Sequence, residues 1–492
     1  MIVNATFGFS VLFLLLTSAS CQSEELLLKH LRFPPKFLLG CGSSAYQIEG
    51  AWNVSDKAES MWDRFVRKNG STIDNETADV TTDSYRKYKE NIAILKFIGF
   101  DSFRISISWS RILPTGFTNQ ISKDGVQYYH NVIDEMLVND IEPLVTIYHW
   151  DHPQVLEEMG GWTNSEMVDW FADYATVVFR EFGPKVKRFT TINEPVILCT
   201  MGYISTILAP GKNGYGFGEY MCIHNMLKAH ARAYRIYESQ FKAQQKGEIG
   251  VSTLFNTYFP ATPEDQFALN VSYAFNIGWP LHPILSKEGD YPPLMKEMVA
   301  KKSEEQGYSR SRLPTFDAYW IDYIRGTYDF VAVNHYTSLT VTAGDSGPVP
   351  SHTNDQGLIF SQSSCWKRGS LDWLYVVPEG LRHALGYIAK NYNNPPMYVT
   401  ENGYSDYGTL KDNDRISYFR NYLNQLLLTM YIDGVDVRGY FAWSLLDSFE
   451  WNSGYRHRFG IVSVDFNDPD RPRTLKKSAL WWKRVNKARR IL

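Results

Sequence analysis

The sequence predicts a single (β/α)8 barrel, from the chain length, an alternation of strand and helix patterns, and the polar residues that end the predicted strands. The chain has 492 residues, of which 44% are hydrophobic. No fixed-period repeat, low-complexity tract or Pro/Ser-rich linker divides it. Because α/β barrels of this size commonly fold as one unit, one large core is expected.

Eight β-rich runs recur along the chain, and amphipathic helical stretches separate them. Several runs, such as EPLVTIYHW, are continuously apolar, which is typical of parallel strands covered on both faces. Alternation of this kind indicates crossover helices, and eight units close into a barrel. The predicted strands are Phe37–Tyr46, Phe100–Trp109, Glu142–Trp150, Arg188–Glu194, Glu248–Tyr258, Tyr328–Thr337, Met397–Glu401 and Val437–Ser444. The predicted helices are Ser84–Ile98, Val126–Val138, Met167–Phe182, Tyr220–Gln244, Pro378–Lys390 and Arg415–Tyr431.

A doubly wound open sheet is the competing architecture. It would normally carry a Gly-rich phosphate-binding turn after its first strand. The segment LLGCGSSAY is not such a turn.

The N-terminus reads as a secretory signal. Phe7–Thr17 is a short apolar run followed by small residues, too short to span a bilayer. We assign residues 1–21 to the signal and 22–492 to the barrel, and expect a secreted protein without a membrane partner. A buried N-terminal strand is the alternative, since no Lys or Arg precedes Phe7.

Glycosylation motifs and cysteines agree with secretion. Cys199 and Cys222 bracket a Gly-rich stretch, so either a disulfide or two free buried thiols fits them. Beyond the predicted signal, acceptor motifs for N-glycosylation occur at Asn53, Asn69, Asn75 and Asn270.

Charge and composition restrict the classes of partner that the protein is expected to bind. The 50 basic and 53 acidic residues give a net charge of -3, without long runs of one sign, which argues against a nucleic-acid partner. Cysteine and histidine show no zinc-binding spacing, and we expect neither a metal nor an organic cofactor. A homodimer is compatible with the sequence, which does not determine the oligomeric state.

Seven predicted strands end in polar motifs: SAYQIEG, FRISISWSR, YHWD, TINEP, NHYT, TENG and AWSLLDSFEW. Polar side chains at the end of an apolar run are costly to bury without a partner or a purpose. Barrel active sites gather at the carboxyl ends of the strands. The motifs therefore predict one active site at this rim.

Two carboxylates in these motifs suit glycoside hydrolysis. Glu194 and Glu401 end the fourth and seventh predicted strands, which face each other across a barrel mouth. A pair about 5 Å apart supplies an acid for the leaving oxygen and a nucleophile on the opposite face of the sugar, so that configuration is retained. Either motif alone could be a solvated turn.

The ordered motifs QIEGAW, HWD, NEP, NHYT, ENG and SFEW resemble glycoside hydrolase family 1. The resemblance runs from FPPKFLLG to the FNDPDRPRTLKKSALWWKRV ending, and is similar to secreted animal members, including insect digestive β-glucosidases and myrosinases. It implies a retaining β-glycosidase that hydrolyses terminal β-D-glucosides, and also galactosides or fucosides, through a covalent glycosyl-enzyme. A small-molecule β-glycoside is the implied partner.

The resemblance also implies roles for single residues. Glu194 matches the acid/base and Glu401 the nucleophile, while Arg104 and Tyr336 match the pair that supports Glu401. A cation and a phenol there keep Glu401 ionised, while Glu194 retains its proton, so a bell-shaped pH profile is expected. The substrate-binding matches are Gln47, His149, Asn193, Trp373, Trp443, Glu450 and Trp451.

Each match has a purely structural alternative, such as core packing for His149 and Trp443, an ion pair for Arg104 and rim packing for Trp373. Three further tryptophans and one histidine stay outside the predicted site. We expect Trp109, Trp150 and Trp162 to pack in the core, whereas the place of His152 is open.

Other functions remain open. A myrosinase needs cations for a sulfated aglycone, and VILCTMGY and TSLTVT contain none, so only the more distant Lys212 or Arg368 could serve. A transglycosidase would use the same residues, so the sequence does not distinguish it from a hydrolase. An inactive binding protein typically lacks one of the two glutamates, and both are present here. A 6-phosphate would be repelled by Glu450. The sequence does not identify the natural aglycone, because aglycone choice depends on the shape of the βα loops. The structure of Gly211–Gly218 and Gly344–Gln362 is the hardest to predict from the sequence.

Overall fold

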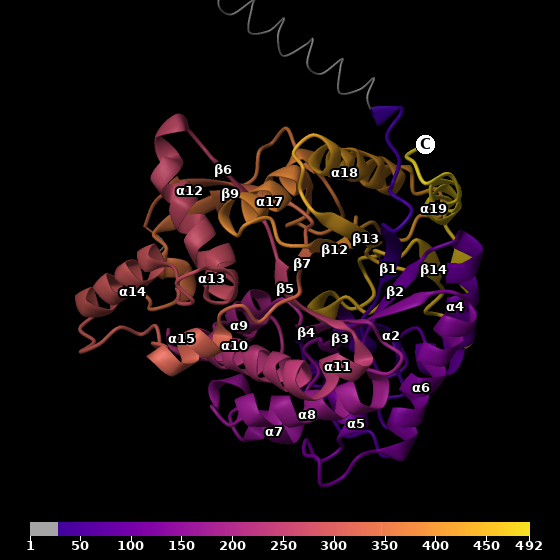
Figure 1. The fold of residues 1–492 in the computed structure, drawn as a ribbon, viewed down its shortest axis with the longest axis horizontal. Helices are drawn as coiled ribbons and strands as arrows, with labels where there is room; N and C mark the ends of the chain where they lie inside the picture. Colours follow the sequence, from indigo (N-terminus) through magenta and orange to yellow (C-terminus); the bar gives the residue numbers. More distant parts are fainter. Residues whose placement is uncertain (1–27, 346) are drawn as a thin grey trace, which may run out of the picture.

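Eight parallel strands close into a barrel in the order β1-β13-β12-β7-β5-β4-β3-β2, and helices surround it (Figure 1). The computed structural model describes residues 28–345 and 347–492, so the predicted signal lies outside the described residues. Strand β1 pairs in parallel with both β13 and β2, which closes the ring. The predicted fold class is therefore confirmed. The barrel strands are β1 (Leu38–Gly42), β2 (Ser102–Ser106), β3 (Glu142–Tyr148), β4 (Arg188–Ile192), β5 (Glu248–Leu254), β7 (Phe330–Asn334), β12 (Met397–Asn402) and β13 (Val437–Ala442).

The helices that follow the barrel strands bury apolar stripes against them. Helix α4 ends at Gly99, whose φ of 83° is left-handed and whose N–H donates to the Leu95 and Lys96 carbonyls. The first helices are α2 (Ala45–Ile48), α3 (Met61–Val66), α4 (Ser84–Ile98), α5 (Trp109–Ile112), α6 (Lys123–Val138), α7 (Gln154–Glu158), α8 (Met167–Phe182), α9 (Pro195–Tyr203) and α10 (Gly218–Ile236). They are followed by α11 (Lys242–Gln245), α12 (Gln266–Tyr273), α13 (Trp279–Leu285), α14 (Pro293–Glu305), α15 (Ala318–Ile324), α16 (His352–Asp355), α17 (Pro378–Asn391), α18 (Asn413–Tyr431) and α19 (Lys477–Ala488).

Two predicted elements are divided in the structure. The predicted helix Tyr220–Gln244 is interrupted by a π-helical turn at Tyr237–Phe241. The predicted strand Glu248–Tyr258 leaves the barrel after Leu254, and its end joins β6 (Thr257–Pro260). Strand β6 pairs with β8 (Ser338–Ala343) and β8 with β9 (Leu358–Ser361), in a separate small sheet. Two-stranded ribbons are formed by β10 (Lys367–Arg368) with β11 (Tyr375–Val376) and by β14 (Val462–Val464) with β15 (Arg473–Leu475).

The group α12–α15 lies to one side of the barrel, at the left of Figure 1. It is inserted between β5 and β7 and was not predicted, because its short helices carry weak amphipathic periodicity. Across residues 28–345 and 347–492, the helices are too short or too polar for any of them to cross a membrane.

A separate apolar cluster fills the barrel interior. Two glycines make room for its rings: a Cβ on Gly40 would lie 2.4 Å from the Phe441 ring, and one on Gly250 would lie 2.2 Å from Phe330. Tyr398 of this cluster lies on β12 a few residues before Glu401, so packed side chains lie below the carboxylate. The cluster consists of Leu144, Phe330, Ala332, Tyr398 and Phe441.

Candidate active site

A cavity of about 730 Å³ opens where the barrel strands end. Of the predicted site residues, Arg104 does not line the cavity, but it reaches the site through Glu401. The structure thus brings all the predicted residues together. Those that line the cavity are Gln47, His149, Asn193, Glu194, Tyr336, Trp373, Glu401, Trp443, Glu450 and Trp451.

Glu401 lies near the end of β12 and is held by two donors. Arg104 Nη1, from β2, donates to Oε1 at 2.5 Å, and the Tyr336 hydroxyl donates to Oε2 at 2.6 Å. Arg104 is fully buried, so this contact is poorly screened by solvent. Burial and the charge of Glu401 raise the pKa of Tyr336 well above its usual value, so its phenol keeps its hydrogen. Two donors on two oxygens suit a carboxylate, which only accepts hydrogen bonds.

Glu194 has a different environment. It follows β4 with a left-handed φ of 44°, immediately before Pro195 begins α9. Asn334 Nδ2 donates to its Oε1 at 2.6 Å. Burial, and next the negative charge of Glu401, raise the pKa of Glu194 well above its ordinary value. Glu194 therefore favours its protonated form, as a general acid must.

Asn193 connects the two carboxyl groups. Its Oδ1 accepts from Arg104 Nη2 at 2.7 Å, from Asn334 Nδ2 at 3.1 Å and from Ser252 at 3.2 Å. Its Nδ2 donates to His149 Nε2 at 3.2 Å. Four contacts fix the amide orientation. Asn334 and Ser252 were not predicted from the sequence, although Asn334 is the first residue of the NHYT motif.

The polar end of the cavity carries further hydrogen-bonding groups. Gln47 Oε1 accepts from the Ser44 hydroxyl at 2.8 Å, and its Nε2 donates to the Phe449 carbonyl at 2.9 Å. Burial raises the pKa of Glu450 to about 8, and lowers that of His149 well below its usual value. Burial therefore favours the neutral forms of both Glu450 and His149.

Tryptophans cover one side of this polar end. Trp451 packs on Trp150 with ring centroids 4.8 Å apart, and Trp150 Nε1 donates to the Asn193 carbonyl at 2.8 Å. Trp150 also lines the cavity, so the prediction that it only packs was incomplete. Trp150 and Trp451 have φ values of 73° and 54°. Together with Glu194, they are non-glycine residues in a left-handed conformation at one site, where backbone strain commonly concentrates.

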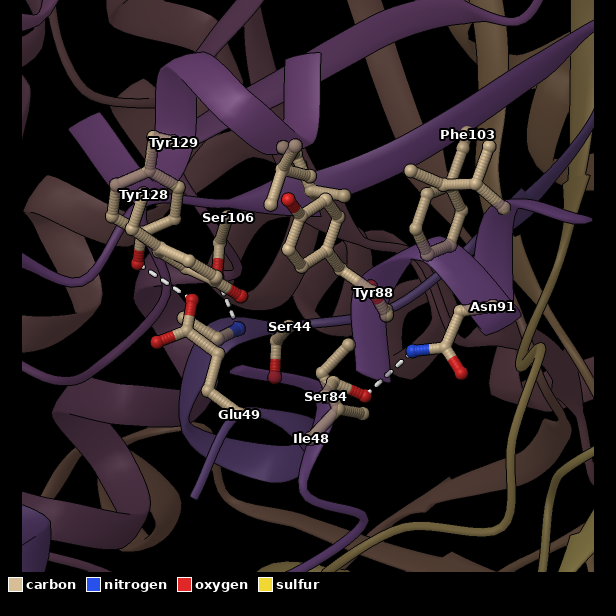
Figure 2. A pocket seen from close by; sticks show the side chains of 15 residues that line it. Ser44, Ile48, Glu49, Ser84, Tyr88, Asn91, Phe103, Ser106, Tyr128 and Tyr129 are labelled. Atoms are coloured by element: carbon tan, nitrogen blue, oxygen red, sulfur yellow. Dashed lines mark hydrogen bonds between the residues drawn. The ribbon is translucent and has the colours of Figure 1, made fainter. Parts of the chain in front are cut away.

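A second, much smaller cavity of about 30 Å³ lies behind α2 (Figure 2). Glu49 accepts from the Tyr129 hydroxyl at 2.6 Å and from Arg111 Nε at 2.9 Å, and the Ala45 N–H donates to Ser106 at 2.7 Å. The volume holds a water or two but not a sugar. Its contacts instead fix α2, the helix that carries Gln47.

The outer mouth contains exposed side chains. Trp373 is 45% exposed and lines the cavity. Lys212 and Arg368 are not among the lining residues; they pair with Glu157 and Asp372, respectively. Arg456 also lines the mouth and was not predicted from the sequence. Its guanidinium pairs with no described residue.

Other predicted features also find their places. Trp109 and Trp162 are fully buried, as expected for packing. His152 is buried between the Tyr148 hydroxyl and Glu157, at 2.8 and 3.0 Å, and does not line the cavity.

A disulfide joins α9 to α10 beside the cavity. It links Cys199 and Cys222, whose Cα atoms are 5.7 Å apart, and it resolves the two alternatives left by the sequence. Within the described ranges, no group of three or more His, Cys, Asp or Glu side chains could hold a metal ion.

Comparison with known proteins agrees with this site. The sequence model of glycosyl hydrolase family 1 matches residues 29–491. Myrosinase 1 of Brevicoryne brassicae is 44% identical over 459 residues, covering 92% of this chain and 98% of that protein. The solved structure of aphid myrosinase superposes with a TM-score of 0.89, covering 93% of this chain and 99% of that one, at 44% identity. A rice β-glucosidase solved in a covalent complex with glucose has a TM-score of 0.87 at 36% identity, covering 92% of this chain and 98% of that one. This chain therefore belongs to glycosyl hydrolase family 1, and it is a retaining β-glycosidase.

Proposed function

We propose that Glu401 is the nucleophile and Glu194 the acid/base of a double displacement on terminal β-D-glucosides. The observation that carries this proposal is the contrast between two carboxyls of one cavity. Glu401 has a donor on each oxygen, whereas burial and the charge of Glu401 hold the proton on Glu194. Such a pair supplies both roles in a retaining mechanism.

In the first step, Glu401 attacks the anomeric carbon while the bond to the aglycone oxygen breaks. Glu194 gives its proton to that oxygen, and a glycosyl ester forms on Glu401. The ester removes the charge of Glu401, which lowers the proton affinity of Glu194. Glu194 then accepts a proton from water as the water oxygen attacks the anomeric carbon and releases Glu401.

The polar end of the cavity suits the sugar. Gln47, His149 and Glu450 offer donors and acceptors for sugar hydroxyls, and Trp443 offers a flat apolar face. Asn193, between the two carboxyls, is placed for the 2-hydroxyl, where a hydrogen bond strengthens toward the transition state. Galactosides, which differ from glucosides at the 4-hydroxyl, and fucosides, which in addition lack the 6-hydroxyl, are also expected as substrates.

The test is a panel of 4-nitrophenyl β-glycosides given to the purified protein, with NMR detection of the first anomer released. Hydrolysis of the β-glucoside with β-glucose as first product supports the proposal. Release of α-glucose would contradict double displacement, and no release from any glycoside would indicate an inactive binding protein.

A second candidate is thioglucosidase activity toward glucosinolates. Arg456 favours it, because this cation lines the mouth without a described side-chain partner and could pair with a sulfated aglycone. The two relatives named as myrosinases agree with it. Glucose release from sinigrin that falls on Arg456→Gln would support this candidate, whereas intact sinigrin beside rapid nitrophenyl glucoside hydrolysis would exclude it.

We further propose a secreted, glycosylated protein in which residues 1–21 are removed. The four N-glycosylation motifs beyond the predicted signal, at Asn53, Asn69, Asn75 and Asn270, place the asparagine on an exposed position. Expression in insect cells tests this. Recovery from the medium, a mass shift on deglycosylation and a mature N-terminus near residue 22 are expected. Light scattering of the same sample tests the homodimer.

A further inference from the structure

Six apolar side chains, from α9, the loop after it, the end of β5 and β8, line the cavity, and we name this group the apolar wall. Ile207 is 49% and Met201 40% exposed on this wall. Apolar side chains that gather beside a binding cavity commonly mark the surface that a ligand covers. The wall consists of Ile197, Met201, Ile207, Leu208, Leu254 and Leu339.

The wall begins at the acid/base. Ile197 and Met201 follow Glu194 at helical spacing, so they lie on the same face of α9. In a retaining mechanism the acid stands beside the leaving oxygen. The group attached to that oxygen therefore enters the part of the cavity that this wall borders, away from the polar end that suits the glucose ring.

The outer part of the wall is held in place from both sides. Ile207 and Leu208 lie between Tyr203 and Lys212, and both of these residues bind the buried Glu157. The Tyr203 hydroxyl donates to Glu157 Oε2 at 2.9 Å, and Lys212 Nζ pairs with Oε1 and donates to the Glu157 carbonyl at 3.0 Å. The wall is thus fixed before a ligand arrives, which reduces the entropy lost on binding.

We propose that the aglycone of the natural substrate is a hydrocarbon group rather than a second sugar. This inference rests on the proposed function and names the substrate class of the same site. A hydrocarbon covers the wall and removes its apolar area from water. A sugar aglycone would place hydroxyls against six side chains that provide no hydrogen-bond partner, and unpaired polar groups oppose binding.

The test compares n-alkyl β-glucosides, from methyl to heptyl, with cellobiose. The alkyl leaving groups are equally poor along the series, so differences in kcat/KM report aglycone binding. We expect kcat/KM to rise about two- to fourfold per methylene, as for burial of each CH2 group. Cellobiose should be cut at least about tenfold less efficiently than heptyl glucoside, since its hydroxyls find no partners on the wall.

The inference would be overturned by equal kcat/KM values along the alkyl series, or by a kcat/KM for cellobiose that equals that for heptyl glucoside. 4-Nitrophenyl β-glucoside serves as an internal reference in every assay. If it too is not hydrolysed, the proposed function fails; if it is hydrolysed while the alkyl series stays flat, only the aglycone inference fails.

Two variants test whether the gain in kcat/KM per methylene comes from the apolar wall. Ile207→Ser and Leu339→Ser should each reduce the gain per methylene. Ile432→Ser is the matched control, because Ile432 has a similar exposed fraction (52% against 49% for Ile207) but lies at the end of α18, outside the cavity. An unchanged gain in both wall variants, or an equal loss in the control, would contradict the assignment.

Discussion

The two ends of the cavity are built on different principles. At the inner end, Asn193 and both glutamates are less than 10% exposed, and hydrogen bonds within the described residues fix them. At the mouth, Trp373 and Ile207 are nearly half exposed, and the apolar wall contributes side chains without hydrogen-bonding groups. The inner end therefore governs reaction chemistry, whereas the mouth governs which leaving group is accepted. Substitutions in the two regions should accordingly change different kinetic constants.

The largest effect is expected at the inner end, from Glu401→Gln. An amide cannot form the glycosyl ester, so kcat should fall by about 10⁵-fold or more, as for removal of other enzymatic nucleophiles. Kinetics with 4-nitrophenyl β-glucoside measure the loss. Calorimetry with 1-deoxynojirimycin should still detect binding, since the sugar-facing residues remain. Retained turnover would assign the nucleophile elsewhere.

The loss of kcat/KM in Glu194→Ala should depend on the leaving group. For alkyl glucosides, kcat/KM should drop by about 10²–10⁴-fold, the usual contribution of a general acid. A 2,4-dinitrophenyl glucoside needs no protonation, so its kcat/KM should change little. Azide should restore turnover and yield β-glucosyl azide. If both substrates lose activity equally, Glu194 is not the acid.

The pH profile should move when Asn334 is replaced. The Asn334 hydrogen bond lowers the pKa of Glu194, against the dominant effect of burial. Asn334→Ala should therefore raise that pKa further, and the alkaline limb of kcat/KM should shift to higher pH because the acid stays protonated longer.

Ser252→Ala is the matched control for Asn334→Ala, since Ser252 contacts Asn193 but not Glu194. Its alkaline limb should stay at the wild-type position. A shift of equal size in both variants, or a shift of the Asn334 variant to lower pH, would show that the limb does not report Glu194.

The smallest effect is expected at the mouth, from Lys212→Met. Losing the contact with buried Glu157 frees one end of the segment that carries Ile207 and Leu208. KM for heptyl glucoside should rise about three- to tenfold, comparable to the loss of one or two buried methylenes. The methyl glucoside should change little, and kcat should be retained for both.

Lys296→Met provides the control for this change. Lys296 has similar side-chain exposure (46% against 44%) and also pairs with a carboxylate, Asp290, but lies on α14 outside the cavity. It should behave as wild type. Identical alkyl kinetics in the two variants would mean that the Glu157 contacts do not position the wall.

The same contrast explains what could be predicted from the sequence. Glu194, Glu401 and Arg104 lie in short motifs on predicted strands, and a barrel brings strand ends together whatever the loops do. The structure places them in one network accordingly. The predicted helix Met167–Phe182 was found with the same bounds, because it carries a long apolar periodicity.

The mouth was not predictable in this way. Ile207, Leu254 and Leu339 come from a loop, from the end of β5 and from the side sheet strand β8. Their place at the cavity depends on the chain leaving the barrel after Leu254. The continuous apolar pattern of Glu248–Tyr258 predicted a single strand and gave no sign of this break. Arg456 was missed for a related reason, since a cation in a loop carries no signal of the cavity it faces.

Identification of the residue that becomes covalently bound to the sugar tests the central claim most directly. The protein would be incubated with 2-deoxy-2-fluoro-β-D-glucosyl fluoride, which forms the glycosyl ester but hydrolyses it slowly, and then digested and mapped by mass spectrometry. We expect stoichiometric labelling of Glu401, with loss of activity in proportion. Labelling of any other residue, or full activity with no label, would contradict it.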